Sequence, residues 1–109
     1  MRISSYRSMW LLTMFDLPTA TPAARKNYAK FRNFLLDQGF MMLQYSVYGR
    51  HCPSDENAAV HCERVRANLP PDGEVRILQV TDRQFERMQV FWGKMRQPVE
   101  QASEQLTLF

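Results

Sequence analysis

The sequence has no apolar run long enough to cross a membrane, since a helical span needs about 20 consecutive apolar residues and no stretch approaches that length. The first residues carry charge but are not followed by a long apolar segment with a small-residue cleavage site, so they do not resemble a secretion signal. The length of 109 residues suits one small domain, and a disulfide between its two cysteines is not expected in a reducing compartment. We therefore expect a cytoplasmic protein that forms one small domain.

The chain also lacks the ligand spacing of a structural zinc site. Its cysteines directly follow histidines, in the pairs His51–Cys52 and His61–Cys62, whereas zinc sites separate paired ligands by a few residues. Neighbouring side chains point in different directions, so one pair seldom supplies two ligands to a single ion. The sequence has four glycines and no glycine-rich loop. A regulatory module that binds a small ligand between its subunits is an alternative function, but no motif in the sequence supports it.

The chain is mildly basic, with a formal net charge of +3 at pH 7 and a pI of about 9.1. This charge permits a polyanionic partner such as nucleic acid without demanding one, because a cluster of charges is more often simply solvated. The basic residues gather in the first third of the chain and again near its end. Five of them are candidates for phosphate contacts: Arg7, Arg25, Lys26, Lys30 and Arg83.

Residues 10–18 form the most informative segment that is present. Large apolar residues from Trp10 to Phe15 end abruptly at Asp16, and Pro18 stops the run two residues later. A continuous apolar run of this length predicts a strand buried on both faces. A carboxylate where that strand emerges can serve as a fixed oxygen ligand for a hard cation such as Mg²⁺. The alternative is that Asp16 only caps a turn before Pro18.

Two helices are predicted from their caps and apolar stripes. Thr21 is a good N-cap for the first helix, and Gly39 can end it in a left-handed conformation. Its apolar residues recur at helical spacing: Ala24, Tyr28, Phe31 and Leu35. A second helix is expected over about residues 56–68, capped by Ser54 or Asp55. Its stripe consists of Ala58, Cys62, Val65 and Leu69.

The remaining segments predict strands. Residues 40–52 alternate with a period of two and are largely apolar on both faces, and a break near Gln44 or Gly49 would divide them into two strands. A further strand over residues 74–81 is followed by a short helical turn. Residues 88–93 could continue this turn as a helix, but Val90, Phe91 and the stop at Gly93 favour a strand.

This order of elements predicts an α+β, ferredoxin-like βαββαβ sandwich, in which a mainly antiparallel sheet carries two helices on one face. The uncovered face would be too apolar for water, so we expect a homodimer that forms through the sheet. The domain is expected to span residues 1–93. Residues 94–109 are expected to form a polar linker and an additional C-terminal docking strand.

Several of these segments resemble the small adaptation protein of CRISPR systems, the partner of the spacer integrase. Residues 11–18 resemble that family's strand ending in (Tyr/Phe)-Asp-(Ile/Leu/Val). Residues 44–48, Gln-Tyr-Ser-Val-Tyr, resemble its Gln-x-Ser-Val-(Phe/Tyr) strand. Residues 77–82 and the segment ending at Gly93 lie where the family's later strands fall. The resemblance covers about residues 9–93, and the motifs are most similar to the forms found in type II loci.

The resemblance implies a homodimer of ferredoxin-like subunits that bridges two dimers of the integrase, with duplex prespacer DNA lying across the assembly. It also implies a magnesium-dependent nuclease whose metal ligand is the aspartate of the first strand, and Asp16 matches that position. In such a dimer the two aspartates, one from each subunit, would face each other and share a cation.

The residues themselves limit this enzymatic interpretation. Only one carboxylate per subunit matches the family's position, and it would make a weak and mostly hydrated Mg²⁺ site. We therefore expect a DNA-bridging scaffold that contacts phosphates without reading the base sequence. A stand-alone Mg²⁺-dependent endonuclease that acts on RNA or DNA is the alternative.

The last five residues, Gln-Leu-Thr-Leu-Phe, have two interpretations. Leu106, Leu108 and Phe109 can form an extra strand that docks on the integrase or on the other subunit by β-augmentation. The pentapeptide also resembles the Gln-Leu-x-Leu-Phe peptide with which bacterial proteins bind the replicative sliding clamp. The docking strand is the preferred interpretation.

Overall fold

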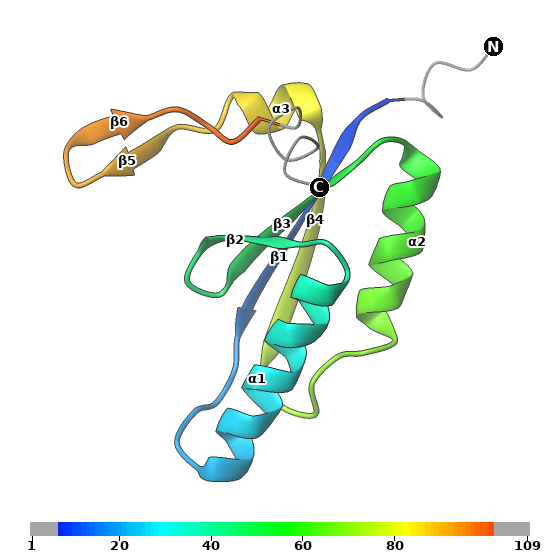
Figure 1. Cartoon of the computed structure of the whole chain (residues 1–109), viewed down its shortest axis with the longest axis vertical. Helices are drawn as coiled ribbons and strands as arrows, with labels where there is room; N and C mark the ends of the chain where they lie inside the picture. The colour runs from blue at the N-terminus through cyan, green and yellow to red at the C-terminus, as the bar shows by residue number, and fades with distance from the viewer. Residues whose placement is uncertain (1–6, 102–109) are drawn as a thin grey trace.

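The computed structural model describes residues 7–101, which form a sheet, two long helices and a projecting hairpin (Figure 1). Its elements, in chain order, are β1 (Met9–Asp16), α1 (Pro22–Asp37), β2 (Met41–Gln44), β3 (Val47–Cys52), α2 (Asp55–Arg66), β4 (Glu74–Thr81), α3 (Asp82–Glu86), β5 (Val90–Trp92) and β6 (Met95–Gln97). Within the described residues, no helix is both long and apolar enough to cross a membrane.

The main sheet has the strand order β2-β3-β1-β4, and every neighbouring pair of strands is antiparallel. Helix α1 connects β1 to β2, and α2 connects β3 to β4, so a strand-helix-strand unit occurs twice along the chain. This order and connectivity confirm the predicted ferredoxin-like α+β sandwich.

Both long helices pack on the same face of the sheet. Alternate residues of β1 point to that face, where Leu11 and Phe15 belong to one buried cluster with Phe31 and Leu35 of α1 and Val65 of α2. The residues between them on β1 point to the opposite face, which is also apolar. The continuous apolar run in the sequence therefore reflects a strand that is covered on both sides.

The ends of α1 follow the predicted caps. The Thr21 side chain accepts a hydrogen bond from the Ala24 N–H at 3.0 Å. At the other end Gly39 has a φ of +88°, and the Phe40 N–H donates to the Leu35 carbonyl at 3.0 Å. This reversal returns Phe40 to the core beneath the helix.

Helix α2 begins as predicted, but its apolar stripe requires a correction. The Ser54 side chain caps the helix by accepting a hydrogen bond from the Asn57 N–H at 3.0 Å. Leu69, which was expected in the stripe, is 49% exposed, because α2 ends at Arg66 and Leu69 lies in the loop that follows. His61 is buried on the inner side of the helix instead.

Residues 40–52 divide at Tyr45 and Ser46 into β2 and β3, next to the predicted break at Gln44. The alternative break at Gly49 is wrong, because Gly49 lies inside β3 and pairs with strands on both sides. The two strands therefore form a hairpin whose turn lies at the end of the sheet.

The second face of the sheet is covered at one end by α3 and the residues that follow it. Trp10 and Leu12 of β1 point to this face and pack with Phe85 of α3. Partly buried residues extend the cluster: Leu43, Val80, Met88 and Val99. Leu78 of β4 is left 48% exposed. The apolar area that remains for a partner is thus smaller than the sequence suggested, because the chain covers part of it itself.

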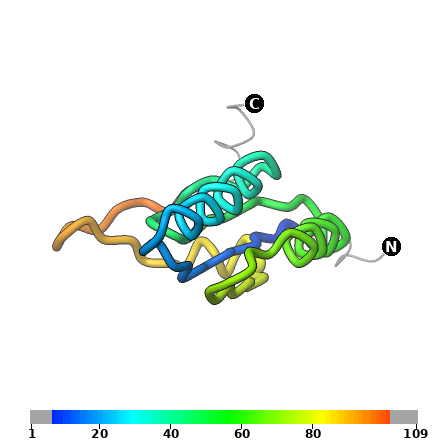
Figure 2. Tube along the Cα trace, turned by 90° about the horizontal axis from the view of Figure 1, so that it is seen from below, coloured from blue at the N-terminus to red at the C-terminus, as the bar shows by residue number. Residues whose placement is uncertain are grey.

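β5 and β6 pair with each other and, among the described residues, with no strand of the main sheet. They form a hairpin that extends away from the sheet (Figures 1 and 2). The strand expected over residues 88–93 is therefore present but stands outside the sheet. The polar segment that follows Gly93, expected to be a linker, contains β6, because Gly93 adopts a φ of +65° and turns the chain back.

Two expectations about the end of the chain stay predictions. The additional C-terminal strand falls on residues 105–109, which lie outside the described residues. The division into a domain over residues 1–93 and a docking segment over residues 94–109 also stays a prediction.

Candidate metal centre and nucleic-acid surface

Asp16 is the last residue of β1 and is exposed where the strand leaves the sheet. Because Phe15 points into the core beneath the helices, Asp16 belongs to the opposite face, together with Trp10 and Leu12. The pairing of β1 with β4 puts Glu74, the first residue of β4, directly opposite Asp16. Two carboxylates therefore lie on adjacent strands, on one face and at one end of the sheet, with Cβ atoms about 5 Å apart for such a pair.

Glu74 is a site residue that the sequence alone did not reveal. Like charges directly opposite each other destabilise a strand pair. An Arg76 guanidinium nitrogen lies 3.3 Å from a Glu74 carboxylate oxygen, but both side chains are largely exposed, so this ion pair contributes little. β1 and β4 each have eight residues, and aligning them end to end as antiparallel neighbours would have predicted the pairing.

The turn between β2 and β3 reaches the same end of the sheet. Ser46 has a φ of +61° and is the one non-glycine residue with a positive φ within residues 7–101. Its carbonyl accepts a hydrogen bond from the Phe15 N–H at 3.0 Å. Its hydroxyl lies 2.9 Å from the hydroxyl of Tyr28 on α1. The residue before Asp16 is thus attached to the turn, and the turn is attached to α1.

The chemistry of the two carboxylates fits the Mg²⁺ that the resemblance implies, because this cation prefers carboxylate and water oxygens. In the part of the chain that the structure describes, no group of three or more His, Cys, Asp or Glu side chains is arranged to hold a metal. One chain therefore offers Asp16 and Glu74, and octahedral Mg²⁺ requires further oxygens from water, a phosphate or a second subunit.

The predicted phosphate-binding residues divide into two groups, and the first lies on α1. Arg25, Lys26 and Lys30 are exposed on this helix, which has no acidic residue in its first turn. The Arg25 guanidinium donates to the Thr19 carbonyl at 3.0 Å, which keeps it close to the loop that follows Asp16. These three residues therefore lie toward the same end of the molecule as the carboxylate pair.

The second group, Arg7 and Arg83, lies at the opposite end of β1. Both line a shallow cavity of about 460 Å³. The cavity is also lined by Ser8, Thr81, Asp82 and Glu86. Since a strand rises by roughly 3.3 Å per residue, the length of β1 separates the two basic groups by about 25 Å. The structure does not bring all five basic residues onto one surface.

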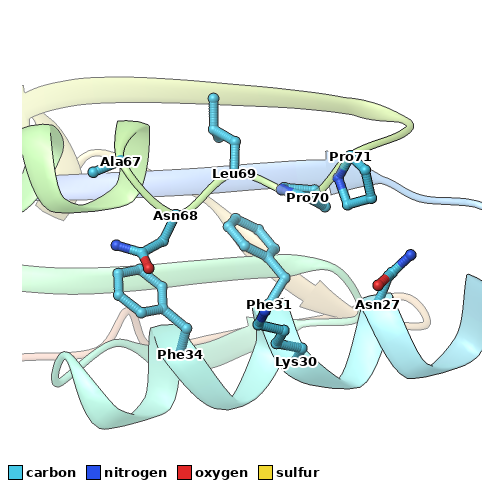
Figure 3. A pocket seen from close by; sticks show the side chains of 9 residues that line it. All are labelled: Asn27, Lys30, Phe31, Phe34, Ala67, Asn68, Leu69, Pro70 and Pro71. Carbon is cyan, nitrogen blue, oxygen red and sulfur yellow. The ribbon is translucent and has the colours of Figure 1, made fainter.

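Lys30 also borders a groove of about 220 Å³ between α1 and the loop after α2 (Figure 3). Phe31 and Phe34 point from α1 toward that loop, which contributes Leu69 and two prolines. Among residues 7–101, Lys30 is the one charged residue that lines the groove. The groove belongs to the helical side of the sheet and is separate from the face that carries Asp16.

The side chains of the two His–Cys pairs are buried or half-buried in this fold. On β3, the His51 ring packs edge-on against Trp10, with centroids 5.6 Å apart, while Cys52 points into the core beneath the helices. Burial is the main cause that lowers the pKa of both His51 and His61, and burial also raises the pKa of the Cys52 thiol. All three side chains are therefore held in their neutral forms near pH 7.

The predicted docking residues Leu106, Leu108 and Phe109 lie outside the described residues, so their contacts stay a prediction.

Comparison with known proteins assigns the chain to a family. The sequence pattern of the family described as "CRISPR associated protein Cas2" matches residues 9–88, which include the carboxylate pair, the Ser46 turn and α1. A relative from Parvibaculum lavamentivorans is 59% identical over 101 residues, covering 93% of this chain and 100% of the relative. Relatives from Flavobacterium psychrophilum and Paracidovorax avenae are each 48% identical, covering 99% and 98% of this chain and 94% and 99% of their own lengths. All three are named CRISPR-associated endoribonuclease Cas2. The resemblance found in the sequence is confirmed, and the chain belongs to the CRISPR associated protein Cas2 family.

Proposed function

We propose that the protein is the homodimeric, DNA-bridging subunit of the complex that acquires CRISPR spacers, and that it acts in the cytoplasm. Family membership supports a role in CRISPR adaptation. The observation that carries the bridging role is the position of two surfaces on opposite sides of the sheet. The incompletely covered apolar face suits a second copy, and the basic helix α1 lies on the other side. Dimerisation through the sheet therefore leaves both copies of α1 free for DNA.

Exposed apolar side chains support a second copy as the occupant of the open face. Leu78 is 48% exposed on that face. The β5–β6 hairpin exposes Phe91, Trp92 and Met95, and an isolated two-stranded hairpin is only marginally stable in water. In a symmetric dimer, the hairpin of each subunit can pack on the incompletely covered sheet face of the other. This contact occurs twice, and it covers both exposed surfaces of both subunits.

Duplex DNA is the proposed ligand of α1, and its binding is expected to depend on salt and not on base sequence. The test is fluorescence anisotropy with labelled duplexes of two unrelated sequences over a series of salt concentrations. The measured quantity is the slope of the logarithm of the binding constant against the logarithm of the salt concentration. We expect Arg25→Gln/Lys26→Gln to make this slope shallower by roughly 0.9 for each phosphate that is no longer neutralised, equally for both sequences. Arg64→Gln/Arg66→Gln removes the same charge from α2 and serves as the control. An equal reduction in the control would show that net charge, and not the α1 surface, binds the duplex.

We also propose that the dimer bridges two dimers of the spacer integrase and that Leu106, Leu108 and Phe109 dock on a partner. Deleting residues 105–109 and measuring binding to the integrase and to the sliding clamp separately tests this. Loss of integrase binding alone supports the docking strand, and loss of clamp binding alone supports the clamp peptide. Unchanged binding to both partners would remove both proposals.

A Mg²⁺-dependent endonuclease is a second candidate function. The name that the relatives carry and the facing carboxylates favour it. Asp16 and Glu74 would hold the ion, which when bound polarises a phosphodiester and lowers the pKa of a water. Asp16→Ala separates the two candidates when RNA cleavage, DNA cleavage and spacer acquisition are measured on the same variant. Abolished cleavage with intact acquisition supports the scaffold, whereas abolished acquisition with an intact dimer and complex contradicts a purely structural role.

A further inference from the structure

We propose that Ser46 and Tyr28 are positioning residues for Asp16, which act through a chain of hydrogen bonds from α1 to the end of β1. The inference rests on the metal-dependent activity proposed above and names two residues on which that activity depends. The two hydroxyls are hydrogen-bonded to each other at 2.9 Å, and the carbonyl of Ser46 accepts the N–H of the residue before Asp16, so their effect passes through the backbone next to Asp16.

The backbone of Ser46 indicates that its side chain is needed at this position. A φ of +61° is unfavourable for any residue with a Cβ atom, and glycine would adopt it without strain. Strained residues of this kind gather at functional sites, where the surrounding structure holds them in place. The hydroxyl of Ser46 lies 2.9 Å from the Tyr28 hydroxyl. A glycine at this position could not form that hydrogen bond.

The same turn extends the pairing of β1 to the residue before Asp16. The regular register between β1 and β3 ends at the pair Met14 and Val47. One residue further, the Phe15 N–H donates to the Ser46 carbonyl at 3.0 Å. Tyr28 supports this bond twice, because its hydroxyl holds Ser46 and its ring packs edge-on against the Phe15 ring at 5.7 Å.

Asp16 is therefore fixed from both neighbouring strands. On one side it pairs with Glu74 of β4, and on the other the Ser46 turn holds the adjacent peptide. A metal that is bound by few protein ligands is sensitive to small displacements of each ligand. Breaking the Tyr28–Ser46 hydrogen bond is expected to loosen the end of β1 and weaken metal binding while the fold persists.

Ser46→Gly distinguishes positioning from a purely structural role. This substitution removes the hydroxyl and the unfavourable φ together, so the stability of the fold is not expected to fall while metal affinity does. Tyr28→Phe removes only the partner hydroxyl. Tyr48→Phe is the matched control, because its ring also packs against Phe15, at 5.6 Å, and its hydroxyl forms none of the hydrogen bonds found in residues 7–101.

The experiment measures Mn²⁺ binding to the full-length protein by electron paramagnetic resonance. We expect Ser46→Gly and Tyr28→Phe each to weaken binding about 5-fold, with the double variant no worse than either one because both break the same hydrogen bond. Tyr48→Phe is expected to bind as the unmodified protein does. Unchanged affinity in Tyr28→Phe, alongside abolished binding in Asp16→Asn, would overturn the inference.

Amide hydrogen exchange at Phe15 provides a readout that does not depend on metal. We expect faster exchange at this amide in Ser46→Gly and Tyr28→Phe and no change in Tyr48→Phe. If the unmodified protein and Asp16→Asn bind Mn²⁺ equally, the proposed metal-dependent activity fails. In that case the exchange rates alone test the positioning role of Ser46 and Tyr28. An unchanged exchange rate of the Phe15 amide in Tyr28→Phe would overturn it.

Discussion

The indole of Trp10 stacks on the ring of Phe85, with ring centroids 4.0 Å apart and ring planes inclined by 8°. The indole N–H also donates to the Asp82 carboxylate at 2.8 Å. These two contacts fasten α3 to the face of the sheet opposite the long helices. They decide how much of that face stays open for a second subunit, and from which point the β5–β6 hairpin leaves the domain.

Replacing Phe85 with alanine is expected to detach α3 from the sheet. Phe85 is 1% exposed, and truncation of a buried phenylalanine costs about 3–5 kcal/mol of the free energy of unfolding. Urea unfolding followed by far-UV circular dichroism measures this cost. Phe85→Leu keeps most of the volume and is expected to cost less than about 2 kcal/mol. A cost below about 1 kcal/mol for Phe85→Ala would contradict the role of the stack.

Two leucines with nearly equal exposure, one on each side of the sheet, allow a controlled test of the predicted dimer interface. Leu78 on the open face is 48% exposed and Leu69 beside the helical groove is 49% exposed. If the sheet face forms the interface, Leu78→Asp buries an unpaired charge and is expected to weaken dimerisation by about 100-fold or more. Leu69→Asp is expected to leave the dimer intact. Analytical ultracentrifugation of both variants checks this, and dissociation by Leu69→Asp alone would place the interface on the helical side.

Acid is expected to destabilise the fold through His61. Burial first, and then the positive charges of Arg50 and Arg64, lower the pKa of this imidazole in the folded state from its ordinary value of 6.5. Below that ordinary value the unfolded chain binds a proton that the folded chain resists, so stability falls as the pH falls through the window between the two pKa values. Thermal unfolding from pH 7 to pH 5 measures this slope. His61→Leu is expected to make the slope smaller, and an unchanged slope would contradict the assignment.

Arg50 is expected to be important for the connection between α1 and α2. Its guanidinium donates to the Gln38 carbonyl at 2.7 Å and to the Asn57 side-chain oxygen at 3.2 Å, so one half-buried side chain joins the end of α1 to the start of α2. Arg50→Met is expected to cost about 1.5–3 kcal/mol in denaturant unfolding, since it removes hydrogen bonds to a charged group. Arg64→Met removes one exposed hydrogen bond and is expected to cost less than about 0.5 kcal/mol. Equal costs for both variants would contradict this view.

Features set by neighbouring residues were predictable from the sequence. The Thr21 and Ser54 caps, the reversal at Gly39 and the strand that ends at Asp16 each follow from the chemistry of a few adjacent residues. The fold class could also be predicted, because few architectures accommodate these local elements in this order.

Features that depend on contacts between distant segments were not predictable in the same way. Glu74 lies 58 positions after Asp16 (74 − 16), and only the register of β1 with β4 brings the two together. Phe85 covers Trp10 although no local pattern connects them. The strand β6 after Gly93 was not predicted, because it is three residues long and polar except for Met95, whereas the strand before Gly93 was expected. The positive φ of Ser46 could not be predicted from the sequence, because a serine, unlike a glycine, is not typical of a left-handed conformation.

Magnesium is expected to stabilise the protein through Asp16 and Glu74, and removal of the metal with EDTA is expected to lower the melting temperature. A ligand that binds only the folded state raises its stability by mass action, so the shift depends on Mg²⁺ concentration. Without metal, Asp16→Asn removes the repulsion between opposed carboxylates and is expected to raise stability by roughly 0.5 kcal/mol. The same variant is expected to lose the Mg²⁺-dependent shift.

Glu74→Gln is expected to reduce the Mg²⁺-dependent shift as well, and Glu63→Gln is its matched control. Glu63 pairs with Arg66 on α2 as Glu74 pairs with Arg76 on β4, and all four side chains are similarly exposed. The loss of an exposed ion pair is therefore common to both variants, while only Glu74→Gln removes a carboxylate opposite Asp16. Differential scanning fluorimetry with and without Mg²⁺ measures both effects. Equal shifts in the two variants would exclude Glu74 from the metal site and leave Asp16 as its single carboxylate per subunit.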